Sequence, residues 1–466
     1  MLLLIGHLAS AASLDNLEVG GSWGSPTARN PTAAWWNPAG LSAGGHRILI
    51  ENAPTFGGMR VERDEPNGGP DNIKAFGAVP FAGFSSDLGI RGLGIGGALT
   101  VPMIRGGESI YSSDPDTDGS AAYHLRSGDI WAANLILGAS YQLQERIGVG
   151  IAAHRVQGSW SALINNDTMP NLYDELQDMD QVPDPDIYRD ENLESADYAA
   201  TLDIGELTDA AWTWGAGIMA SPIEQLDVGI SYIAPVQLYH TGETTLYLSC
   251  PPQSDAAGRF GAESFGICDT TLQADASIGY TLPGRLNAGI AFTPRDDLRA
   301  ELMGGYVWWS VMKDFRVEVF NLAEKNPELK EETAALLTQD RKWARENQNA
   351  WFGGLDLKAR PSERWTIGGR VLYDTAAVPD IAMCPNNADA NTLILSGLVA
   401  FQAFKPLTIG LSGARYLYQV RTITDSGFYM TLDEDSRAED RWNYPHGNGT
   451  YEIYSTRLGI SVLSEF

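Results

Sequence analysis

Apolar residues recur at every second position along most of this chain, and that period limits what the chain can fold into. Trp365, Ile367 and Val371, for example, alternate with polar or small residues. Stretches with the same pattern are 146–153, 225–232 and 298–309. Because successive side chains of a β-strand point to opposite faces, a period of two indicates strands with one apolar face. The sequence therefore predicts an all-β protein.

The chain offers fourteen such strands, and the connections between them alternate between short and long. The strands are expected near 45–56, 70–84, 88–103, 130–142, 146–157, 210–220, 225–236, 284–293, 297–309, 348–359, 364–374, 392–404, 407–420 and 450–465. The long connections lie near 104–129, 158–209, 237–283, 310–347, 375–391 and 421–448. A membrane barrel turns tightly at its periplasmic end and carries long loops outside, whereas a soluble sandwich does not sort its loops in this way. We therefore expect residues 45–466 to form a 14-stranded antiparallel transmembrane β-barrel with long extracellular loops.

Composition argues against several other classes of protein. The 466 residues include 32 basic and 59 acidic side chains, a net charge of −27, so the far field repels nucleic acid. Apolar runs are too short for a helical membrane span, which needs about 20 residues. Residues 1–12 form an apolar start that ends in small residues. They are read as the remnant of a signal peptide, with an ordinary N-terminal segment as the alternative.

The stretch before the first strand does not alternate, and it carries a resemblance to a known family. Its Asn37-Pro38-Ala39-Gly40-Leu41 element resembles the N-terminal plug of the FadL/TodX family of outer-membrane hydrocarbon transporters. Further similar segments are Trp214–Gly217, Ser221-Pro222, Val228–Tyr232, Leu282–Gly289, Trp308–Ser310 and Asn448–Phe466. No single motif decides the resemblance, which rests on their order and spacing over nearly the whole chain.

The resemblance implies a fourteen-stranded barrel blocked by a plug, here residues 13–44. Family members take up long-chain fatty acids or aromatic hydrocarbons passively, through a groove among the extracellular loops, a lumenal pocket beside the plug and a lateral exit at a kinked third strand. It also implies a monomer in the bacterial outer membrane that contacts lipid or lipopolysaccharide and is not an enzyme. A general porin, or a structural barrel with adhesive loops, is the alternative function.

The third expected strand contains the residues that would form such an exit. Gly94, Gly96, Gly97 and Pro102 weaken or bend a strand, and Pro102 cannot donate to the ladder. The other interpretation is that these glycines make room for bulky neighbours inside the barrel.

Arginines are the candidates for binding a fatty-acid carboxylate. Arg91, Arg299 and Arg370 are expected to face the lumen by parity, together with Arg457. The alternative is that they pair with acids such as Glu301, Asp374 or Glu452 as structural ladders.

Calcium is the one candidate cofactor, and none is required for the expected transport. Asp114, Asp116 and Asp118, followed by Gly119, match the opening of an EF-hand-type calcium loop, but Leu125 replaces the bidentate glutamate. A solvated acidic turn is the alternative.

Two further features lie in the expected outer loops. Cys250 and Cys268 occupy one loop of an exported chain, so we expect a disulfide between them, and Cys384 is left over. Residues 326–346 have a helical pattern with Asn326 as the N-cap. This helix is expected either to line the access groove or to pack across the barrel mouth.

Overall fold

The computed structural model describes residues 17–64, 69–109, 126–144, 146–167, 199–248, 270–329, 341–427 and 447–466, with the single residues 121, 124, 334 and 338. The expected signal-peptide remnant, the three aspartates of the calcium candidate and the Cys250–Cys268 pair lie outside the described residues.

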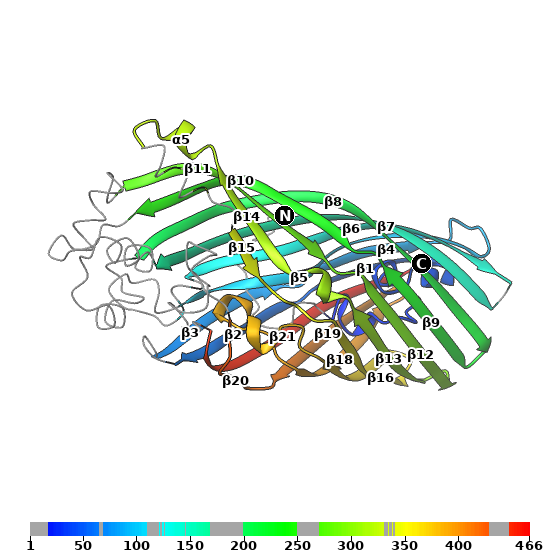
Figure 1. Ribbon diagram of the computed structural model, residues 1–466. Helices are drawn as coiled ribbons and strands as arrows, with labels where there is room; N and C mark the ends of the chain where they lie inside the picture. The colour runs from blue at the N-terminus through cyan, green and yellow to red at the C-terminus, as the bar shows by residue number, and fades with distance from the viewer. Residues whose placement is uncertain are drawn as a thin grey trace.

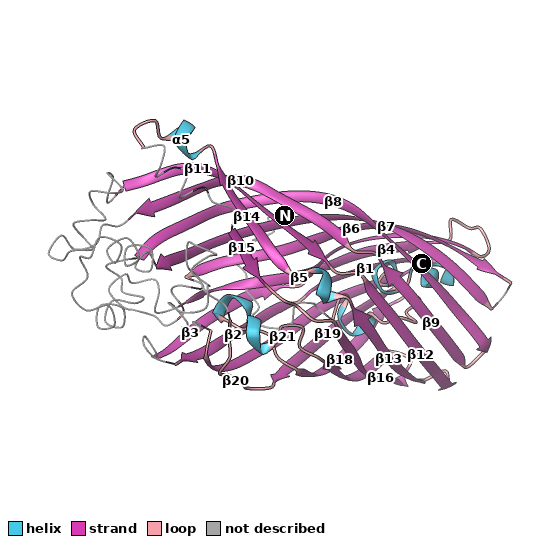
Figure 2. Cartoon of the chain, viewed as in Figure 1, coloured by secondary structure: helices cyan, strands magenta, loops and turns pink. Residues whose placement is uncertain are grey.

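Fourteen strands pair in order and close into an antiparallel ring (Figures 1 and 2). The ring closes at β1, which pairs with β4 on one edge and with β21 on the other. In ring order the strands are β1 (His46–Asn52), β4 (Phe81–Ser86), β5 (Leu93–Ser109), β6 (Ser127–Leu143), β7 (Ile147–Asp167), β8 (Ala199–Ile223), β9 (Leu226–Ile233), β12 (Arg285–Arg295), β13 (Leu298–Val307), β16 (Ala350–Ser362), β17 (Trp365–Asp374), β18 (Thr392–Phe404), β19 (Leu407–Tyr418) and β21 (Gly449–Glu465). Closure confirms the 14-stranded barrel predicted from the alternation.

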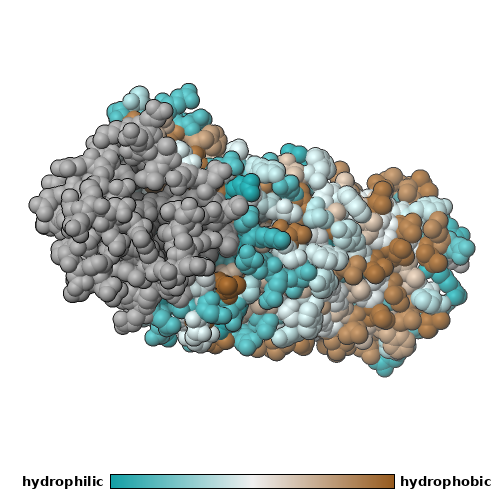
Figure 3. Space-filling model, in the orientation of Figure 1, coloured by the Kyte–Doolittle hydropathy of each residue, from teal (hydrophilic) through white to brown (hydrophobic). Residues whose placement is uncertain are grey.

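The outward face of the ring is an apolar band bordered by aromatic side chains. On the side of the long connections, ring contacts run from Trp214 to Tyr232, Tyr232 to Trp308 and Trp308 to Tyr306, with centroids 5.2–5.8 Å apart. Near the short turns, Trp365 and Phe401 lie 4.8 Å apart. Figure 3 shows the apolar surface concentrated in the half of the molecule that carries the short turns. Such a band between aromatic belts is what a barrel presents to lipid.

Among the described residues, seven further strands continue the wall beyond the outer aromatic belt. They are β2 (Pro54–Arg63), β3 (Gly69–Ala78), β10 (Val236–Leu248), β11 (Thr270–Leu282), β14 (Asp314–Phe320), β15 (Arg341–Ala344) and β20 (Arg421–Ile423). Together with the far ends of β5–β8 and β21 they form a curved sheet, called the extension here, at the end of the molecule away from the short turns (Figure 1).

Five strands of the extension, namely β10, β11, β14, β15 and β20, occupy sequence ranges that the alternation assigned to long loops. In contrast, β3 falls almost wholly within the expected strand 70–84, and β2 begins within the expected strand 45–56. The strands of the extension have the opposite polarity from those of the ring, because their outer face meets water and their inner face is apolar. On β10, Leu238 and Leu246 are buried inside, whereas Gln237 and Glu243 are exposed outside. Strands of that kind lack the lipid-facing apolar stripe by which the ring strands were recognised.

Helices are few and short among the described residues. They are η1 (Gly21–Trp23), α1 (Ala33–Trp36), η2 (Pro38–Ala43), η4 (Trp309–Val311), α5 (Leu322–Lys325), η5 (Asp380–Ala382) and η6 (Pro385–Asn387). In that part of the chain, no helix has the length and hydropathy to cross a membrane.

The helix predicted at 326–346 is wrong at both ends. Asn326 does not begin a helix but follows the last residue of α5 as its C-cap, and Arg341–Ala344 is strand β15. The Asn326 side chain instead bonds the backbone of Gln273 on β11, accepting at 3.1 Å and donating at 2.7 Å. Docking onto a neighbouring strand thus overrides the local capping pattern.

Two apolar clusters fill the interior. One surrounds residues 17–45, called the N-terminal segment here, with Trp36, Leu41 and Phe352 among its members. The other fills the extension and includes Trp160 and Leu238. Met383 and Cys384, from the connection after β17, also belong to this second cluster, so that connection covers the open side of the extension.

Candidate functional site

The N-terminal segment lies inside the ring, held by the element that carries the family resemblance. Asn37 donates from Nδ2 to the carbonyl oxygens of Pro26 and of Ile218 on β8, at 3.0 and 3.1 Å. Its Oδ1 accepts from the backbone N–H of Ala39 at 3.1 Å, which starts η2 at Pro38. Asn37 therefore fixes the fold of the segment and its position on the wall with one side chain.

Inward-facing glycines of the wall let this element approach. A Cβ at Gly217 on β8 would overlap Oδ1 of Asn37, and one at Gly150 on β7 would overlap the backbone of Pro38 and Ala39. Without a side chain at these two positions, the segment lies directly against the strands.

The first of three buried arginine clusters joins the segment to the two strands where the ring closes. Arg457 on β21 donates to Glu18 at 2.8 Å and to Glu51 on β1 at 2.7 Å. All three side chains are buried, and Glu18 also accepts from the Ser396 hydroxyl of β18 at 2.6 Å. Buried charges persist only when they are paired and hydrogen-bonded in this way.

The second cluster is centred on Arg370, one of the candidate carboxylate contacts. Its Nε donates to Asp356 at 2.7 Å, and its two Nη atoms donate to the carbonyl oxygens of Gly21 at 3.3 Å and Gly24 at 2.6 Å. Asp356 and Arg370 are direct partners in the register of β16 and β17. The guanidinium is therefore already engaged with the wall and with the segment.

The third cluster is centred on Arg299, the other lumenal candidate. Arg299 donates to the Thr27 hydroxyl at 2.6 Å, to Glu301 at 3.3 Å and to Asp227 at 3.5 Å. Glu301 is one of the acids expected for a structural ladder. Because the guanidinium groups of Arg299 and Arg370 already donate to carboxylates of the wall, they are poor donors for the carboxylate of a ligand.

Arg91 does not face the lumen, and that expectation is wrong. It is exposed in the turn between β4 and β5. The parity count began the strand at Leu88, but Gly89 and Gly92 have positive φ angles and form the turn, so β5 begins at Leu93.

Glycines lie on both the inner and the outer face of β5. A Cβ at Gly94 or Gly96 would overlap Leu41 of the N-terminal segment, so both glycines make room for a neighbour inside the barrel. Gly97 lies beside Phe84 and Leu137, whose side chains are exposed on the outer surface.

Pro102 lies where the wall beside β5 is interrupted. β5 pairs with β4 up to Thr100, and its pairing with β3 begins only at Glu108. On its other edge, the register with β6 shifts by one residue between Thr100 and Met103. Within the described backbone, residues 101–107 therefore have no ladder partner on the β3–β4 side.

A second interruption, between β8 and β10, is bridged by side chains. Ladder pairing stops at Gly215 and resumes at Thr208. Between them, Thr213 donates to the Ala234 carbonyl at 2.9 Å, and Asp209 accepts from the Tyr239 N–H at 2.7 Å. These bonds hold the two strands together where the ladder does not.

A pocket lies inside the barrel between these two interruptions. Its volume is about 70 Å³, and most of its lining is apolar: Trp35, Pro102, Ala132, Val156, Ile233, Ala234, Val236, Leu282, Pro283, Val307 and Trp309. Three polar or charged residues, Asn134, Thr213 and Arg285, complete the lining. The volume is smaller than the roughly 150 Å³ that holds benzene in an apolar protein cavity, so a hydrocarbon enters only when lining side chains move.

Arg285 supplies the cation of the pocket and was not singled out by the sequence analysis. Its guanidinium carbon lies 5.4 Å from the Trp36 ring centroid and 5.1 Å from that of Phe352, and its Nε donates to Asn287 at 2.8 Å. Aromatic faces stabilise a partly desolvated guanidinium. The available signal was the Pro283-Gly284 break, which ends one strand and starts another at this arginine.

Comparison with known proteins identifies the family. A profile of the outer membrane protein transport proteins (OMPP1/FadL/TodX) matches residues 12–386. The chain belongs to this family. Its members are channels of the outer membrane rather than enzymes. Among curated protein sequences, none matches significantly.

Solved structures with the same fold include three outer-membrane proteins of low sequence identity. A Pseudomonas aeruginosa FadL homologue has a TM-score of 0.72 at 15% identity and covers 98% of both chains. The Ralstonia pickettii toluene transporter TbuX has a TM-score of 0.62 at 14% sequence identity, and the match covers 98% of this chain and 99% of the TbuX chain. The Pseudomonas putida toluene transporter TodX has a TM-score of 0.64 at 12% sequence identity, and the match covers 94% of both chains.

Metal binding stays a prediction. The described residues contain no group of three or more His, Cys, Asp or Glu side chains suited to a metal ion. Asp114, Asp116 and Asp118 are not among them. Cys384 is buried, and its thiol donates to Asn386 at 3.2 Å.

Proposed function

We propose that this protein is a passive outer-membrane channel for hydrophobic molecules, namely long-chain fatty acids or aromatic hydrocarbons. The observation that carries the proposal is an apolar pocket between the N-terminal segment and an interrupted wall. An aqueous pore gives an apolar solute no favourable environment, whereas burial in an apolar path gains about 0.8 kcal/mol per CH₂.

The proposed path has three parts. A ligand first meets the apolar interior of the extension, then moves into the pocket, and leaves sideways beside β5. The N-terminal segment acts as the plug, and its bonds to Arg299, Arg370 and Arg457 fix it in place across the ring. Pro102 lines the pocket and lies at the interrupted ladder, which supports an exit beside it toward the lipid side of the wall.

The polar end of the ligand determines which class of hydrophobic molecule the channel takes up. A fatty-acid carboxylate would be bound by Arg285, the cation in the pocket lining. Toluene and similar hydrocarbons require only the apolar walls. Contact of the outer surface with lipopolysaccharide and a monomeric state belong to the same proposal.

The experiment measures uptake of labelled oleate and toluene into proteoliposomes, with labelled sucrose as a leak control. Ala132→Trp fills the pocket and is expected to lower the uptake of both ligands at least tenfold. Ala133→Trp is the matched control, because the next residue of β6 points away from the lumen and should leave uptake unchanged. Sucrose flux through the unsubstituted protein, without uptake of either apolar ligand, would contradict the channel and support a porin.

A further inference from the structure

Two buried polar side chains stand beside the pocket with unused hydrogen-bonding atoms. Relative exposure is 0% for His240 on β10 and 3% for Tyr280 on β11, and their rings stack at 5.1 Å with an interplanar angle of 13°. Among the residues that the structure describes, neither Nε2 of His240 nor the hydroxyl of Tyr280 has a hydrogen-bond partner. An unmade bond is costly to a buried polar atom, so two adjacent ones point to a missing polar group.

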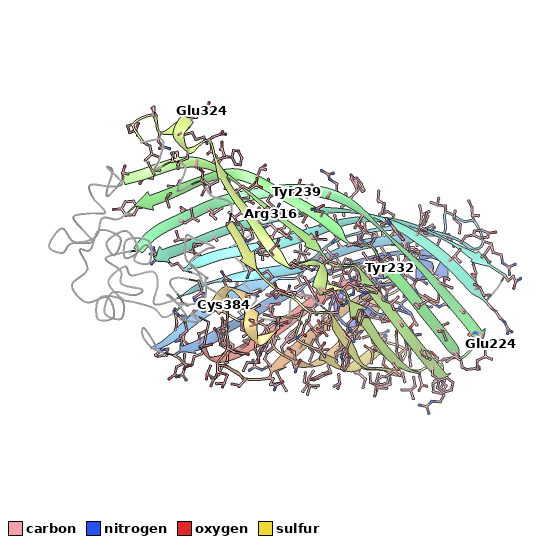
Figure 4. All side chains as sticks on the ribbon, in the orientation of Figure 1. Glu224, Tyr232, Tyr239, Arg316, Glu324 and Cys384 are labelled. Atoms are coloured by element: carbon pink, nitrogen blue, oxygen red, sulfur yellow. The ribbon has the colours of Figure 1, made fainter. Side chains whose placement is uncertain are left out.

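Strand register places this pair next to the pocket. Val236 and Leu282, which line the pocket, are direct partners across β10 and β11. The next inward-facing pair toward the outside is Leu238 with Tyr280, and His240 follows. Tyr239 points outward between them and is labelled in Figure 4, farther from the short turns than Tyr232 and Glu224 of the same wall. The His240–Tyr280 pair therefore lies just outside the pocket, toward the extension.

The chemistry of the pair defines what it can bind. Nδ1 of His240 lies 3.2 Å from the Leu207 carbonyl oxygen, an acceptor, so Nδ1 carries the proton. Burial lowers the pKa of His240, which keeps the ring neutral at pH 7 and leaves Nε2 as an acceptor. Tyr280 offers its O–H as a donor. A ligand hydroxyl has both matching roles, because it can donate to Nε2 and accept from Tyr280.

Charge around the pair disfavours an anion. Asp209 on β8 acts electrostatically on both His240 and Tyr280. A carboxylate or phenolate would meet this like charge in an apolar interior, whereas a neutral hydroxyl would not.

We propose that His240 and Tyr280 form a binding site for the hydroxyl group of neutral, hydroxylated hydrocarbons such as phenols and alkanols. This inference rests on the proposed function, since it assumes that apolar ligands reach the interior of the barrel. It adds a ligand class that Arg285, a cation suited to carboxylates, does not select.

The experiment compares binding of p-cresol and toluene, which differ by one hydroxyl, to the full-length protein in lipid nanodiscs by equilibrium dialysis. Tyr280→Phe removes one oxygen atom and is expected to weaken p-cresol binding three- to tenfold while leaving toluene within twofold. His240→Phe is expected to have the same selective effect. Tyr247→Phe is the matched control, a tyrosine with 41% exposure on β10, and should change neither ligand.

The outcomes separate this site from the proposed function. An unchanged ratio of p-cresol to toluene affinity in Tyr280→Phe would overturn the site, and so would absence of p-cresol binding to the unsubstituted protein. Selective loss of p-cresol binding without any transmembrane uptake of toluene would leave the site standing and contradict the channel. Because Tyr280→Phe deletes a single buried oxygen, it remains decisive if His240→Phe fails to fold.

Discussion

Around the N-terminal segment, buried arginine–carboxylate pairs are added to an apolar cluster, whereas the interior of the extension is held mainly by an apolar cluster. A buried ion pair has one good geometry and loses much when it is broken. An apolar cluster repacks at low cost when volume is conserved. The contrast indicates a fixed half around the N-terminal segment and an adaptable half, the extension, where side chains can move to admit a hydrocarbon.

The largest expected effect comes from breaking the fixed half. Arg457→Gln leaves Glu18 and Glu51 buried side by side without their cation. We expect the free energy of unfolding to fall by about 3–5 kcal/mol, measured by urea titration in lipid vesicles. Arg60→Gln, which breaks an exposed pair with Glu62, is the control and should change it by less than about 1 kcal/mol. If both substitutions lowered the free energy of unfolding equally, the buried ion pairs would not distinguish the two regions.

Arg285 lies at the border between the two halves and sharpens the comparison. Arg285→Met keeps an unbranched, flexible side chain but removes the guanidinium and its charge. Oleate uptake is expected to fall about five- to tenfold, because a charge-assisted bond to the carboxylate is lost, while toluene uptake stays within twofold. Arg285→Lys should restore part of the oleate uptake. An equal loss for oleate and toluene would show that Arg285 only supports packing.

A volume-conserving change should be tolerated in the adaptable half. Leu238→Met alters the shape of a fully buried side chain in the extension with little change in volume. We expect the free energy of unfolding to fall by less than about 1.5 kcal/mol, in the same urea titration. A loss as large as that of Arg457→Gln would mean that the extension is packed as rigidly as the surroundings of the N-terminal segment.

The smallest effect is expected outside both halves, in the turn between β4 and β5. Asp87 accepts from the N–H groups of Gly45 at 2.7 Å and Gly89 at 2.8 Å, and these bonds lower its pKa. Its contribution to stability is present above the ordinary pKa and is lost as the pH falls through the lower folded value. Stability of Asp87→Asn should therefore depend less on pH below about pH 4. Identical pH profiles would contradict this role.

The sequence predicted the ring because lipid imposes a visible apolar stripe on each of its strands. Extension strands such as β10 and β11 were missed, since water outside and an apolar core inside reverse that stripe. Glu301 was named among the acids that could pair with the lumenal arginines, and it does bond to Arg299 on the same strand. The partners of Arg457 were not named, because Glu18 and Glu51 come from the other end of the chain and only closure of the ring brings them together.

The pocket was beyond prediction from the sequence for a similar reason. Pro102 was recognised as a residue that bends β5, and it does lie at a break in the ladder. That Pro102 and Arg285 line one pocket depends on the register of six strands around the ring. Alternation fixes which face a side chain occupies, but not which distant side chains share its height in the barrel.

The most direct test of the lateral path is to straighten β5. Deleting Pro102 removes the extra residue between Thr100 and Met103 and restores an unbroken register with β6. Deleting Gly205 is the matched control, since it removes the extra residue of β8 at the register shifts in the extension. We predict that the Pro102 deletion lowers uptake of oleate and toluene at least tenfold and that the Gly205 deletion does not. Undiminished uptake through a folded barrel without Pro102 would contradict a lateral exit beside β5.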